Sequence, residues 1–457
     1  MLNNISNIYF LGICGIGMSA LARWTNLKNF NIKGWDDDIT SPLLDVLSQE
    51  GIEVHNKLDD PDFRLFLKSS QIDNTIIIYT SAISKEHPVF NLFKSKNIKS
   101  YKRADLLQYI SKKYQVIAVA GTHGKTTISI MLSHILKCCS VNCNAFFGGI
   151  SKNYKTNLIV GDSNIMIIEA DEYDKSFLKL NPNISLVSSM DKDHGDIYKT
   201  DQELLDAYSE FILSTKNLVV GHISLSNKFD FTYSLDSISD FYASDIEYNN
   251  KDLCFNIHFP ENQSIRTKLN FGTIYNIENA VAAASLAFNL GLSPTNIAAA
   301  LTSFKGVNRR FDYHWLEKSN SIIIDDYAHH PEELKSLISS VRMRHKQKKI
   351  FLIFQPHLFS RTQEFETQFS EVLSLVDKLV LTDIYPARET KIKGVSSEKL
   401  LKKVDLKYKW HVRGDFNQIE FNRVFKKIIL SNKPDLVITA GAGSVYNLIP
   451  KLQQLLA

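Results

Sequence analysis

The sequence predicts an α/β protein built from three domains in series. Its 457 residues exceed the length of one ordinary hydrophobic core and suit about three domains. In three successive blocks, short apolar runs alternate with helical stretches, a pattern typical of parallel sheets with crossover helices. Polar residues and glycines follow many of these runs, at the sheet edge where ligands bind in such folds. We therefore expect domains over residues 1–104, 105–309 and 310–457.

Composition excludes several classes of protein. The 44% hydrophobic and 22% charged residues are typical of a globular protein, and a net charge of +4 is too small to indicate nucleic acid or a membrane surface as a partner. No apolar run approaches the length of a membrane span and no targeting segment is recognisable, so we expect the protein in the cytoplasm. The five cysteines lack paired Cys-x-x-Cys spacing, which disfavours a disulfide framework and a zinc site.

The first block predicts a binding site for a diphosphate. A strand over residues 7–11 leads through the glycine turn at 12–17 into a helix. The spacing Gly-x-x-Gly-x-Gly differs from the dinucleotide fingerprint, so it indicates a dinucleotide only weakly and a diphosphate better. A second strand ends in an acid, where such folds contact a ribose, and the strand 75–79 delivers a serine that equally fits a helix cap. The candidate substrate-binding residues of this block are Gly12, Gly15, Gly17, Asp36 and Ser81.

The second block contains the most specific motif of the chain. The apolar run 116–120 is followed directly by Gly121-Thr122-His123-Gly124-Lys125-Thr126-Thr127, which predicts a strand that turns through glycine into a helix. Backbone N–H groups of such a turn converge on phosphate oxygens, and the helix N-terminus adds positive potential. In this pattern Lys125 reaches the terminal phosphates and Thr126 binds Mg²⁺. The loop is shortened, because Val119 stands where the usual pattern has its first glycine. The motif predicts use of a nucleoside triphosphate.

Acidic residues end two further strands of this block. The strand 165–168 runs into Glu169-Ala170-Asp171-Glu172, and the strand 184–187 runs towards Asp193 and His194. Carboxylates at strand ends can hold Mg²⁺ against phosphates, because this ion prefers hard oxygen ligands. Solvated turn acids are the plainer interpretation of each cluster taken alone.

The rest of the chain predicts a small antiparallel sheet and then a third parallel one. Alternating apolar and polar residues over 233–269 favour the antiparallel sheet, and helices are expected over 276–290 and 294–304. Strands of the third block are predicted at 321–324, 350–354, 379–382 and 436–439. The polar groups that follow them are Asp325-Asp326-Tyr327-Ala328-His329-His330, Gln355-Pro356-His357 with Arg361, Asp383 with Arg388, and Gly441-Ala442-Gly443. Four strands that deliver His, Arg and Asp to one edge predict a binding site there.

Together these motifs resemble the Mur ligases of peptidoglycan synthesis. The resemblance covers essentially the whole chain in order, and it also includes Arg309-Arg310-Phe311. It implies a Rossmann-like N-terminal domain for a UDP-sugar, a central P-loop ATPase domain with the small antiparallel sheet, and a Rossmann-like C-terminal domain for an amino acid. The implied reaction is an ATP-dependent ligation, in which the lactyl carboxylate of UDP-N-acetylmuramate is activated as an acyl phosphate.

The resemblance also implies a role for each matching residue. Catalytic roles fall to Lys125, His194 and Arg310. Mg²⁺ would be held by Thr126, Glu169 and His194. ATP would be bound by Gly121, Thr122, His123, Gly124, Lys125, Thr126, Thr127, Asn276, Asn279 and Arg310. The amino-acid pocket would be lined by Asp326, Tyr327, His329, His357 and Arg361.

Some positions depart from the family pattern. Tyr275 stands where a histidine is usual before the first asparagine, and Phe271-Gly272 stands in place of Pro-Gly. Ser444-Val445 follows the last glycine turn, where Asp-Ile is common. Several siblings carry a carbamylated lysine on the helix after the Asp-His pair. Between Tyr198 and Thr215 this chain has only Lys199, next to the motif itself, so no carbamate is predicted.

The run Phe354-Gln355-Pro356-His357-Leu358-Phe359-Ser360-Arg361-Thr362 favours one branch of the family. It is typical of the ligase that uses L-alanine, and it is usually missing from the ligase that recycles murein tripeptide onto the same nucleotide sugar. The expected partners are therefore UDP-N-acetylmuramate and L-alanine, with the tripeptide as the alternative.

Three other functions remain as rivals. A GTPase switch is suggested by Asn227-Lys228-Phe229-Asp230, which matches a short guanine-reading pattern. A dinucleotide oxidoreductase is supported only by the first glycine turn, and it leaves the phosphate loop unexplained. A scaffold that binds ATP without catalysis is disfavoured by the joint presence of Lys125, Glu169, His194 and Arg310.

Overall fold

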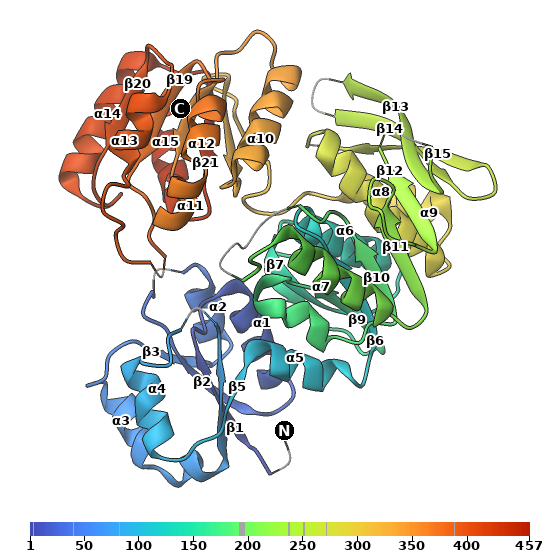
Figure 1. Cartoon of the computed structure of the whole chain (residues 1–457), viewed down its shortest axis with the longest axis vertical. Coiled ribbons are helices and arrows are strands. Elements are labelled where there is room, and N and C mark those ends of the chain that lie inside the picture. The colour runs from blue at the N-terminus through green and yellow to red at the C-terminus, as the bar shows by residue number, and fades with distance from the viewer. Residues whose placement is uncertain are drawn as a thin grey trace. The chain divides into compact units, whose positions relative to one another are not determined.

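Figure 1 shows the computed structural model of the chain, which contains three sheets. It describes residues 1–457 except Asn3, Thr40, Ala82, Lys192, Asp193, His194, Gly195, Asp196, Asp236, Ser237, Asn250, Lys251, Phe271 and Arg388. The chain forms two compact units, one of Met1–Asn270 with Tyr275–Lys305 and one of Phe271–Ile274 with Gly306–Ala457. The predicted α/β class, with mostly parallel sheets, is confirmed.

The first sheet is fully parallel and has the order β3-β2-β1-β4-β5. All five residues of the central strand are buried, as expected for an apolar run covered on both faces. Its strands are β1 (Asn7–Leu11), β2 (Asn31–Trp35), β3 (Glu53–His55), β4 (Thr75–Tyr79) and β5 (Ser100–Lys102). Its helices are α1 (Ile16–Asn26), α2 (Leu43–Gln49), α3 (Pro61–Lys68), α4 (Pro88–Ser95) and α5 (Arg103–Ser111), with the 3₁₀ helix η1 (Ser70–Asn74).

The central sheet has ten strands in the order β15-β14-β13-β12-β11-β10-β6-β9-β7-β8. The strands are β6 (Gln115–Ala120), β7 (Asn144–Ser151), β8 (Thr156–Ile159), β9 (Ile165–Glu169), β10 (Ile184–Val187), β11 (Leu218–His222), β12 (Phe231–Ser234), β13 (Phe241–Asn249), β14 (Asp252–Phe259) and β15 (Gln263–Leu269). The helices are α6 (Lys125–Cys138), α7 (Asp201–Leu213), α8 (Ile274–Asn289) and α9 (Pro294–Ser303), with the 3₁₀ helix η2 (Tyr173–Lys179). Strand β6, which precedes the phosphate loop, pairs in parallel with β10 and β9.

The predicted antiparallel strands lie at one edge of this same sheet. Strands β13, β14 and β15 pair antiparallel, and burial alternates along β14 as the sequence pattern requires. They join the parallel part through β12, which pairs in parallel with β11 and with β13. The small sheet is therefore a continuation of the central one, because local alternation predicts a strand's faces but not its neighbours.

Side-chain hydrogen bonds fasten the first sheet's glycine-turn helix to the central sheet. Arg23 of α1 donates to Thr156 Oγ1 and to Asn157 Oδ1, each at 2.9 Å. Asn157 is fully buried, and its amide donates back to the Ile16 carbonyl at 2.7 Å and to Ser19 Oγ at 2.8 Å. These contacts explain why the first two sheets fall within one compact unit.

The third sheet has the order β16-β17-β21-β18-β19-β20, in which only β16 runs antiparallel to its neighbour among the described pairs. The strands are β16 (Asp312–Leu316), β17 (Ser321–Asp326), β18 (Phe351–Phe354), β19 (Lys378–Thr382), β20 (Lys409–Val412) and β21 (Leu436–Ala440). The helices are α10 (Pro331–Arg344), α11 (Phe359–Glu364), α12 (Glu366–Leu373), α13 (Ser397–Lys403), α14 (Ile419–Asn432) and α15 (Ile449–Leu456), with the 3₁₀ helix η3 (Val445–Leu448). Among the described residues, no helix combines the length and apolar character that crossing a membrane requires.

Candidate active site

The predicted phosphate loop is built by the turn from β6 into α6. Gly121 and Gly124 have φ angles of +125° and +81°, which residues with a side chain rarely adopt. The loop is held from the next strand: the His123 N–H donates to Ser189 Oγ at 3.0 Å, and the Thr122 N–H donates to the Ser189 carbonyl at 3.2 Å. Gly124 caps α6 without a side-chain bond, which leaves its first N–H groups facing the loop. The first turn of α6 can therefore offer N–H groups to an anion, whereas the N–H groups of Thr122 and His123 are bound to Ser189.

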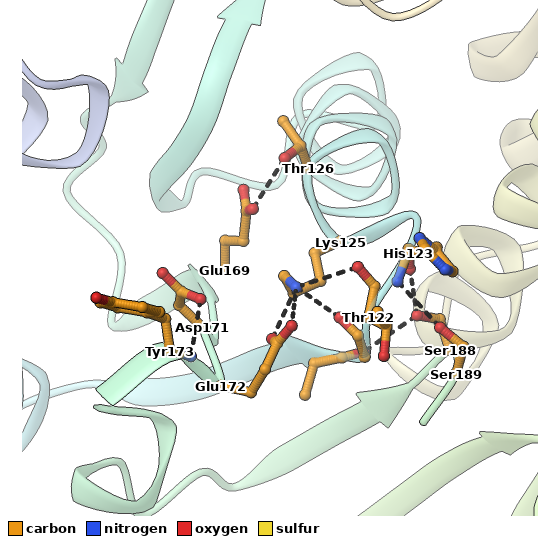
Figure 2. A network of polar contacts seen from close by, with 12 residues as sticks. Thr122, His123, Lys125, Thr126, Glu169, Asp171, Glu172, Tyr173, Ser188 and Ser189 are labelled. Atoms are coloured by element: carbon orange, nitrogen blue, oxygen red, sulfur yellow. Dashed lines mark hydrogen bonds and ion pairs between the residues drawn. The ribbon is translucent and has the colours of Figure 1, made fainter. Parts of the chain in front are cut away.

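Lys125 is held by a carboxylate that the sequence analysis did not single out. Its ammonium donates to both Glu172 oxygens, at 2.7 and 2.9 Å, and to the Gly121 carbonyl at 2.6 Å (Figure 2). Glu172 is 1% exposed. Burial alone would lower the pKa of Lys125, yet the surrounding carboxylates, Glu172 first, raise it, so the lysine stays a cation. Glu172 is the last residue of the acidic run 169–172, and its place in that run is the sequence feature that could have identified it as a site residue.

Thr126 and Glu169 meet beside the loop, as predicted for magnesium ligands. The Thr126 hydroxyl donates to Glu169 Oε1 at 2.8 Å, and the Gly148 N–H donates to Glu169 Oε2 at 2.7 Å (Figure 2 shows the first contact). A Cβ on Gly148 would lie 2.7 Å from both carboxylate oxygens, so this glycine makes room for them. A hydroxyl and a carboxylate are hard oxygen donors, and the pair fits Mg²⁺. No cluster of three or more metal-binding side chains is found within the described ranges.

His194, the third predicted ligand, lies outside the described residues, together with Asp193. The neighbouring Asp191 is described, and its Oδ2 lies 3.4 Å from Nε2 of His123.

The predicted purine side of the site is placed by α8. A Cβ on Gly124 would lie 2.5 Å from Asn279 Oδ1, so this asparagine lies directly against the phosphate loop. Asn276 is one turn earlier and 7% exposed, whereas Tyr275 is 50% exposed. The helix therefore brings Asn279 to the loop and leaves an aromatic ring accessible at its first turn.

The first sheet has the expected glycine turn, but the acid predicted to contact a ribose, Asp36, accepts hydrogen bonds from the backbone instead. Asp36 Oδ2 accepts the Cys14 N–H at 2.8 Å, and Oδ1 accepts the Asp38 N–H at 3.1 Å. The next residue, Asp37, instead lines a pocket of about 390 Å³, with Trp35 and His87. Asp37 accepts from Trp35 Nε1 at 2.8 Å and lies 3.2 Å from His87 Nε2.

Ser81 is exposed just after β4. The next helix, α4, is capped by His87, so the alternative role of Ser81 as its cap is wrong. Of the turn glycines, Gly12 has φ +82° and closes a hydrogen bond to Gly15, whose N–H donates to the Gly12 carbonyl at 3.2 Å.

Arg103 is a second residue that sequence reasoning missed. A Cβ on Gly17 would collide with its guanidinium, so Arg103 lies against the first turn of α1. The same guanidinium lies 3.7 Å from a carboxylate oxygen of Asp171. Arg103 thus joins the glycine turn to the acidic run beside the phosphate loop. No local motif marks it, because its partners are far away in the chain.

In the second unit, three of the predicted pocket residues gather at the carboxyl ends of the strands. The rings of Tyr327 and His329 lie 5.3 Å apart, and those of His329 and His357 lie 5.7 Å apart. His329 Nδ1 lies 2.9 Å from the Tyr327 carbonyl. Arg361 is on α11, which begins two residues after His357. The arrangement brings imidazoles to one edge of the third sheet, where a small amphoteric ligand could be held.

Asp326, by contrast, holds the loop that precedes the sheet. Its Oδ2 accepts the Phe311 N–H at 2.6 Å and its Oδ1 accepts the Ala328 N–H at 2.8 Å. Burial raises the pKa of Asp326, although Arg310 opposes this rise. The Arg310 guanidinium lies over the Tyr327 ring, 4.9 Å from its centroid.

The residues of the guanine-reading pattern, 227–230, make hydrogen bonds and packing contacts within the fold. Asp230 Oδ2 accepts the Val219 N–H at 2.7 Å, and Asn227 donates to Ser209 Oγ at 3.3 Å. The Phe229 ring fills the space in front of Gly221. The segment is thus a packed connection between β11 and β12, which argues against the GTPase reading.

Comparison with known proteins agrees with the three-part architecture. Residues 7–115 match the family description "Mur ligase family, catalytic domain", residues 119–287 match "Mur ligase middle domain", and residues 309–443 match "Mur ligase, glutamate ligase domain". A UDP-N-acetylmuramate--L-alanine ligase of Porphyromonas gingivalis is 40% identical, with 99% of each chain covered. The chain belongs to the Mur ligase family.

Other Mur ligases extend the comparison. A protein of the same name from Christiangramia forsetii is 38% identical, over 100% of this chain and 98% of its own. Among solved structures, the UDP-N-acetylmuramate-alanine ligase MurC of Thermotoga maritima has a TM-score of 0.82 at 24% identity, with 98% of each chain covered. A murein peptide ligase of Psychrobacter arcticus has a TM-score of 0.69 at 18% identity, with the same coverage. These two structures show that the Mur ligase fold is shared.

Proposed function

We propose that the protein joins L-alanine to the lactyl carboxylate of UDP-N-acetylmuramate, with conversion of ATP to ADP and phosphate, in the cytoplasm. Relatives named UDP-N-acetylmuramate--L-alanine ligase, 38% and 40% identical over nearly their full length, carry this proposal. The phosphate loop, with Lys125 held as a cation beside Glu172, supports the ATP-dependent step. We also propose that the three expected domains, 1–104, 105–309 and 310–457, hold the nucleotide sugar, ATP and the amino acid in turn.

The reaction requires activation, because a carboxylate is a poor acyl donor. A lactyl carboxylate oxygen would attack the γ-phosphorus of ATP, the bond to the β-phosphate oxygen would break, and an acyl phosphate and ADP would form. The amine of L-alanine would then add to the acyl carbon through a tetrahedral intermediate, and phosphate would leave. The amine proton would be released as the amide forms.

In this proposal each loop residue has a physical task. Lys125 would turn from Glu172 to the β- and γ-phosphates and neutralise their charge. Arg310, with its planar fork, would bind the γ-phosphate from the second unit. Asn276 and Asn279 would contact the purine side, where Asn279 adjoins the loop.

Thr126 and Glu169 would hold one Mg²⁺, and His194 would bind a second. When bound, Mg²⁺ neutralises phosphate charge and favours in-line transfer. The Thr126–Glu169 contact supports the first assignment, while the second rests on family resemblance.

The two remaining substrates would bind at the edges of the first and third sheets. The turn of Gly12, Gly15 and Gly17 would receive the diphosphate, and the pocket beside Trp35 and Asp37 would receive the nucleoside end. Asp36 and Ser81 would border this site. Tyr327, His329, His357 and Arg361 would surround L-alanine, with Arg361 on its carboxylate and Asp326 holding the pocket loop.

The decisive test is phosphate release from ATP with Mg²⁺ and UDP-N-acetylmuramate. L-alanine and the murein tripeptide are supplied in separate reactions, and a third reaction lacks both. We expect release with L-alanine alone. Release with the tripeptide alone would assign the chain to the recycling ligase instead. If neither amino substrate causes phosphate release, the proposed ligation is wrong.

A further inference from the structure

The loop that carries Arg310 is held in an unusual backbone conformation. Arg309 and Phe311, on either side of Arg310, have φ angles of +62° and +49°, and Gly306 before them has +99°. Left-handed conformations of residues with a side chain are unfavourable, and they persist only where surrounding contacts enforce them. A set of contacts must therefore maintain this loop.

Arg309 makes most of those contacts. Its carbonyl accepts the Tyr327 N–H at 2.8 Å, and its guanidinium donates to the Gly441 carbonyl. The guanidinium also lies over two rings, 4.9 Å from the centroid of Tyr327 and 4.4 Å from that of Tyr446. Arg309 thus ties the loop to the ends of β17 and β21 and to η3.

A buried carboxylate faces this guanidinium. Asp325 is 1% exposed, its Oδ1 accepts the Thr439 hydroxyl at 2.6 Å, and its Oδ2 lies 3.7 Å from Arg309 Nε. Within the described part of the chain, neither Asp325 Oδ2 nor Arg309 Nε has a hydrogen-bond partner. Closing the gap to an ordinary hydrogen bond takes a movement of about 1 Å. Burial of a carboxylate with one oxygen unpaired lowers the stability of the folded protein.

The ring of Tyr327 links this pair to Arg310. Both guanidiniums lie 4.9 Å from its centroid, so this ring is a contact that the two arginines share. The register of the sheet places Asp325 opposite Thr439, which fixes the carboxylate beneath the loop.

We infer that Asp325 is a positioning residue that acts through Arg309 to place Arg310, without contacting any substrate. The inference rests on the proposed role of Arg310 at the γ-phosphate. Asp325 contributes the fixed negative charge, Thr439 orients it, and Arg309 transmits the position to the loop. A group about 1 Å out of place at a reacting phosphate can lower a rate tenfold or more.

The test is a double-mutant cycle in the full-length protein, read by phosphate release from ATP with UDP-N-acetylmuramate and L-alanine. Asp325→Asn keeps the shape of the side chain and removes its negative charge. Arg310→Lys keeps a positive charge but replaces the planar guanidinium with an ammonium. We expect Asp325→Asn to lower kcat about tenfold and to leave the KM of L-alanine within about twofold. In the Arg310→Lys background the same change should lower kcat less than about twofold, because the position that it disturbs is already lost.

Two further variants complete the experiment, one as a control and one as a second way to disturb Asp325. Asp377→Asn removes the carboxylate of another arginine ion pair, with Arg342 at 2.8 Å, just before β19, and it should leave kcat unchanged. Thr439→Val removes the hydroxyl that orients Asp325 and should show a smaller loss with the same dependence on Arg310. It replaces Asp325→Asn if that variant does not fold, as judged by circular dichroism.

The outcomes separate the two proposals. If Arg310→Lys is impaired and Asp325→Asn costs the same factor in both backgrounds, or nothing in either, the inference is overturned and the proposed ligation stands. If Arg310→Lys turns over like the unaltered protein, the proposed role of Arg310 fails and the inference fails with it.

Discussion

At the residue scale, Lys125 is the most sensitive position of the proposed site. Its ammonium donates to Glu172 and to two loop carbonyls, so it is a fixed charge at the phosphate loop. We expect Lys125→Ala to abolish phosphate release, whereas Lys137→Ala, in the last turn of the same helix, should retain it. Turnover by the first variant would contradict the phosphate-loop assignment.

Glu169 should control the response to magnesium. Glu169 accepts a hydrogen bond from the Thr126 hydroxyl, and the two side chains are the proposed Mg²⁺ ligands. Removing the charge of Glu169 should therefore weaken the ion site without altering the loop. We expect Glu169→Gln to need at least about tenfold more Mg²⁺ for half-maximal rate, and calorimetry should show weaker ADP binding at low Mg²⁺. The exposed Glu210 of α7 offers the control Glu210→Gln. A metal response equal to that of the unaltered protein would exclude Glu169 as a ligand.

Asp325 should reduce stability at neutral pH. Burial raises its pKa from 3.8 to about 6, although Arg309 and Thr439 oppose this. Between these two pH values the folded state binds more protons than the unfolded state, so stability falls as the pH rises through this window. Above pH 6 the cost is at most about 3 kcal/mol.

Thermal unfolding should therefore show Asp325→Asn to be more stable than the unaltered protein at pH 8 and similar to it near pH 4. The combination of higher stability and lower kcat would mark a residue kept for its function. A lower unfolding midpoint at pH 8 would contradict this account.

At the scale of elements, the strand-to-helix turn depends on glycine for two reasons at once. A Cβ on Gly121 would lie 2.8 Å from the backbone nitrogens of Ser188 and Ser189, and its φ of +125° is already unfavourable. Gly51 also has a positive φ, +74°, but nothing lies within 4 Å of its Cβ position. We expect Gly121→Ala to weaken ADP binding more than about tenfold, because the loop must move.

Gly51→Ala isolates the conformational cost. It should lower the free energy of unfolding by about 1 kcal/mol and leave ADP affinity unchanged. Calorimetric titration with ADP checks both variants, and equal affinities would show that the loop tolerates displacement.

Most of the elements around the site could be predicted from local pattern. The strands β1, β4 and β10 have the expected bounds, since a buried parallel strand is a continuous apolar run between turns. The short strands β3 and β5 were not predicted, because three residues carry too little pattern. The edge strands β16 and β20 were also missed, because polar side chains interrupt their apolar pattern.

At the scale of the whole molecule, the proposed reaction needs groups from both compact units. Lys125 belongs to the first unit and Arg310 to the second, and both are proposed to contact one triphosphate. Substrates should therefore draw the units together. We expect small-angle scattering to show a smaller radius of gyration with UDP-N-acetylmuramate, Mg²⁺ and a non-hydrolysable ATP analogue than without ligands.

The variant Arg310→Ala provides the control for this experiment. It removes the contact from the second unit and should reduce or abolish the compaction. Identical scattering with and without the three ligands would argue that turnover needs no closure.

The sequence by itself determined the features that depend on neighbouring residues. The phosphate loop is seven consecutive residues, Gly121 to Thr127, and the strand-end clusters follow directly from apolar runs, so local spacing was enough to predict them. The order of motifs along the chain was also enough to indicate the family.

Only the tertiary structure decided which distant residues meet. It directed Asp36 to the backbone of Cys14, placed Glu172 on Lys125, brought Arg103 to Gly17, and set Arg309 above Asp325 and beside Gly441. These partners lie 16 to 132 residues apart or come from separate elements, and their meeting depends on strand order and register. No local spacing encodes that order, because it results from how the complete sheets pack.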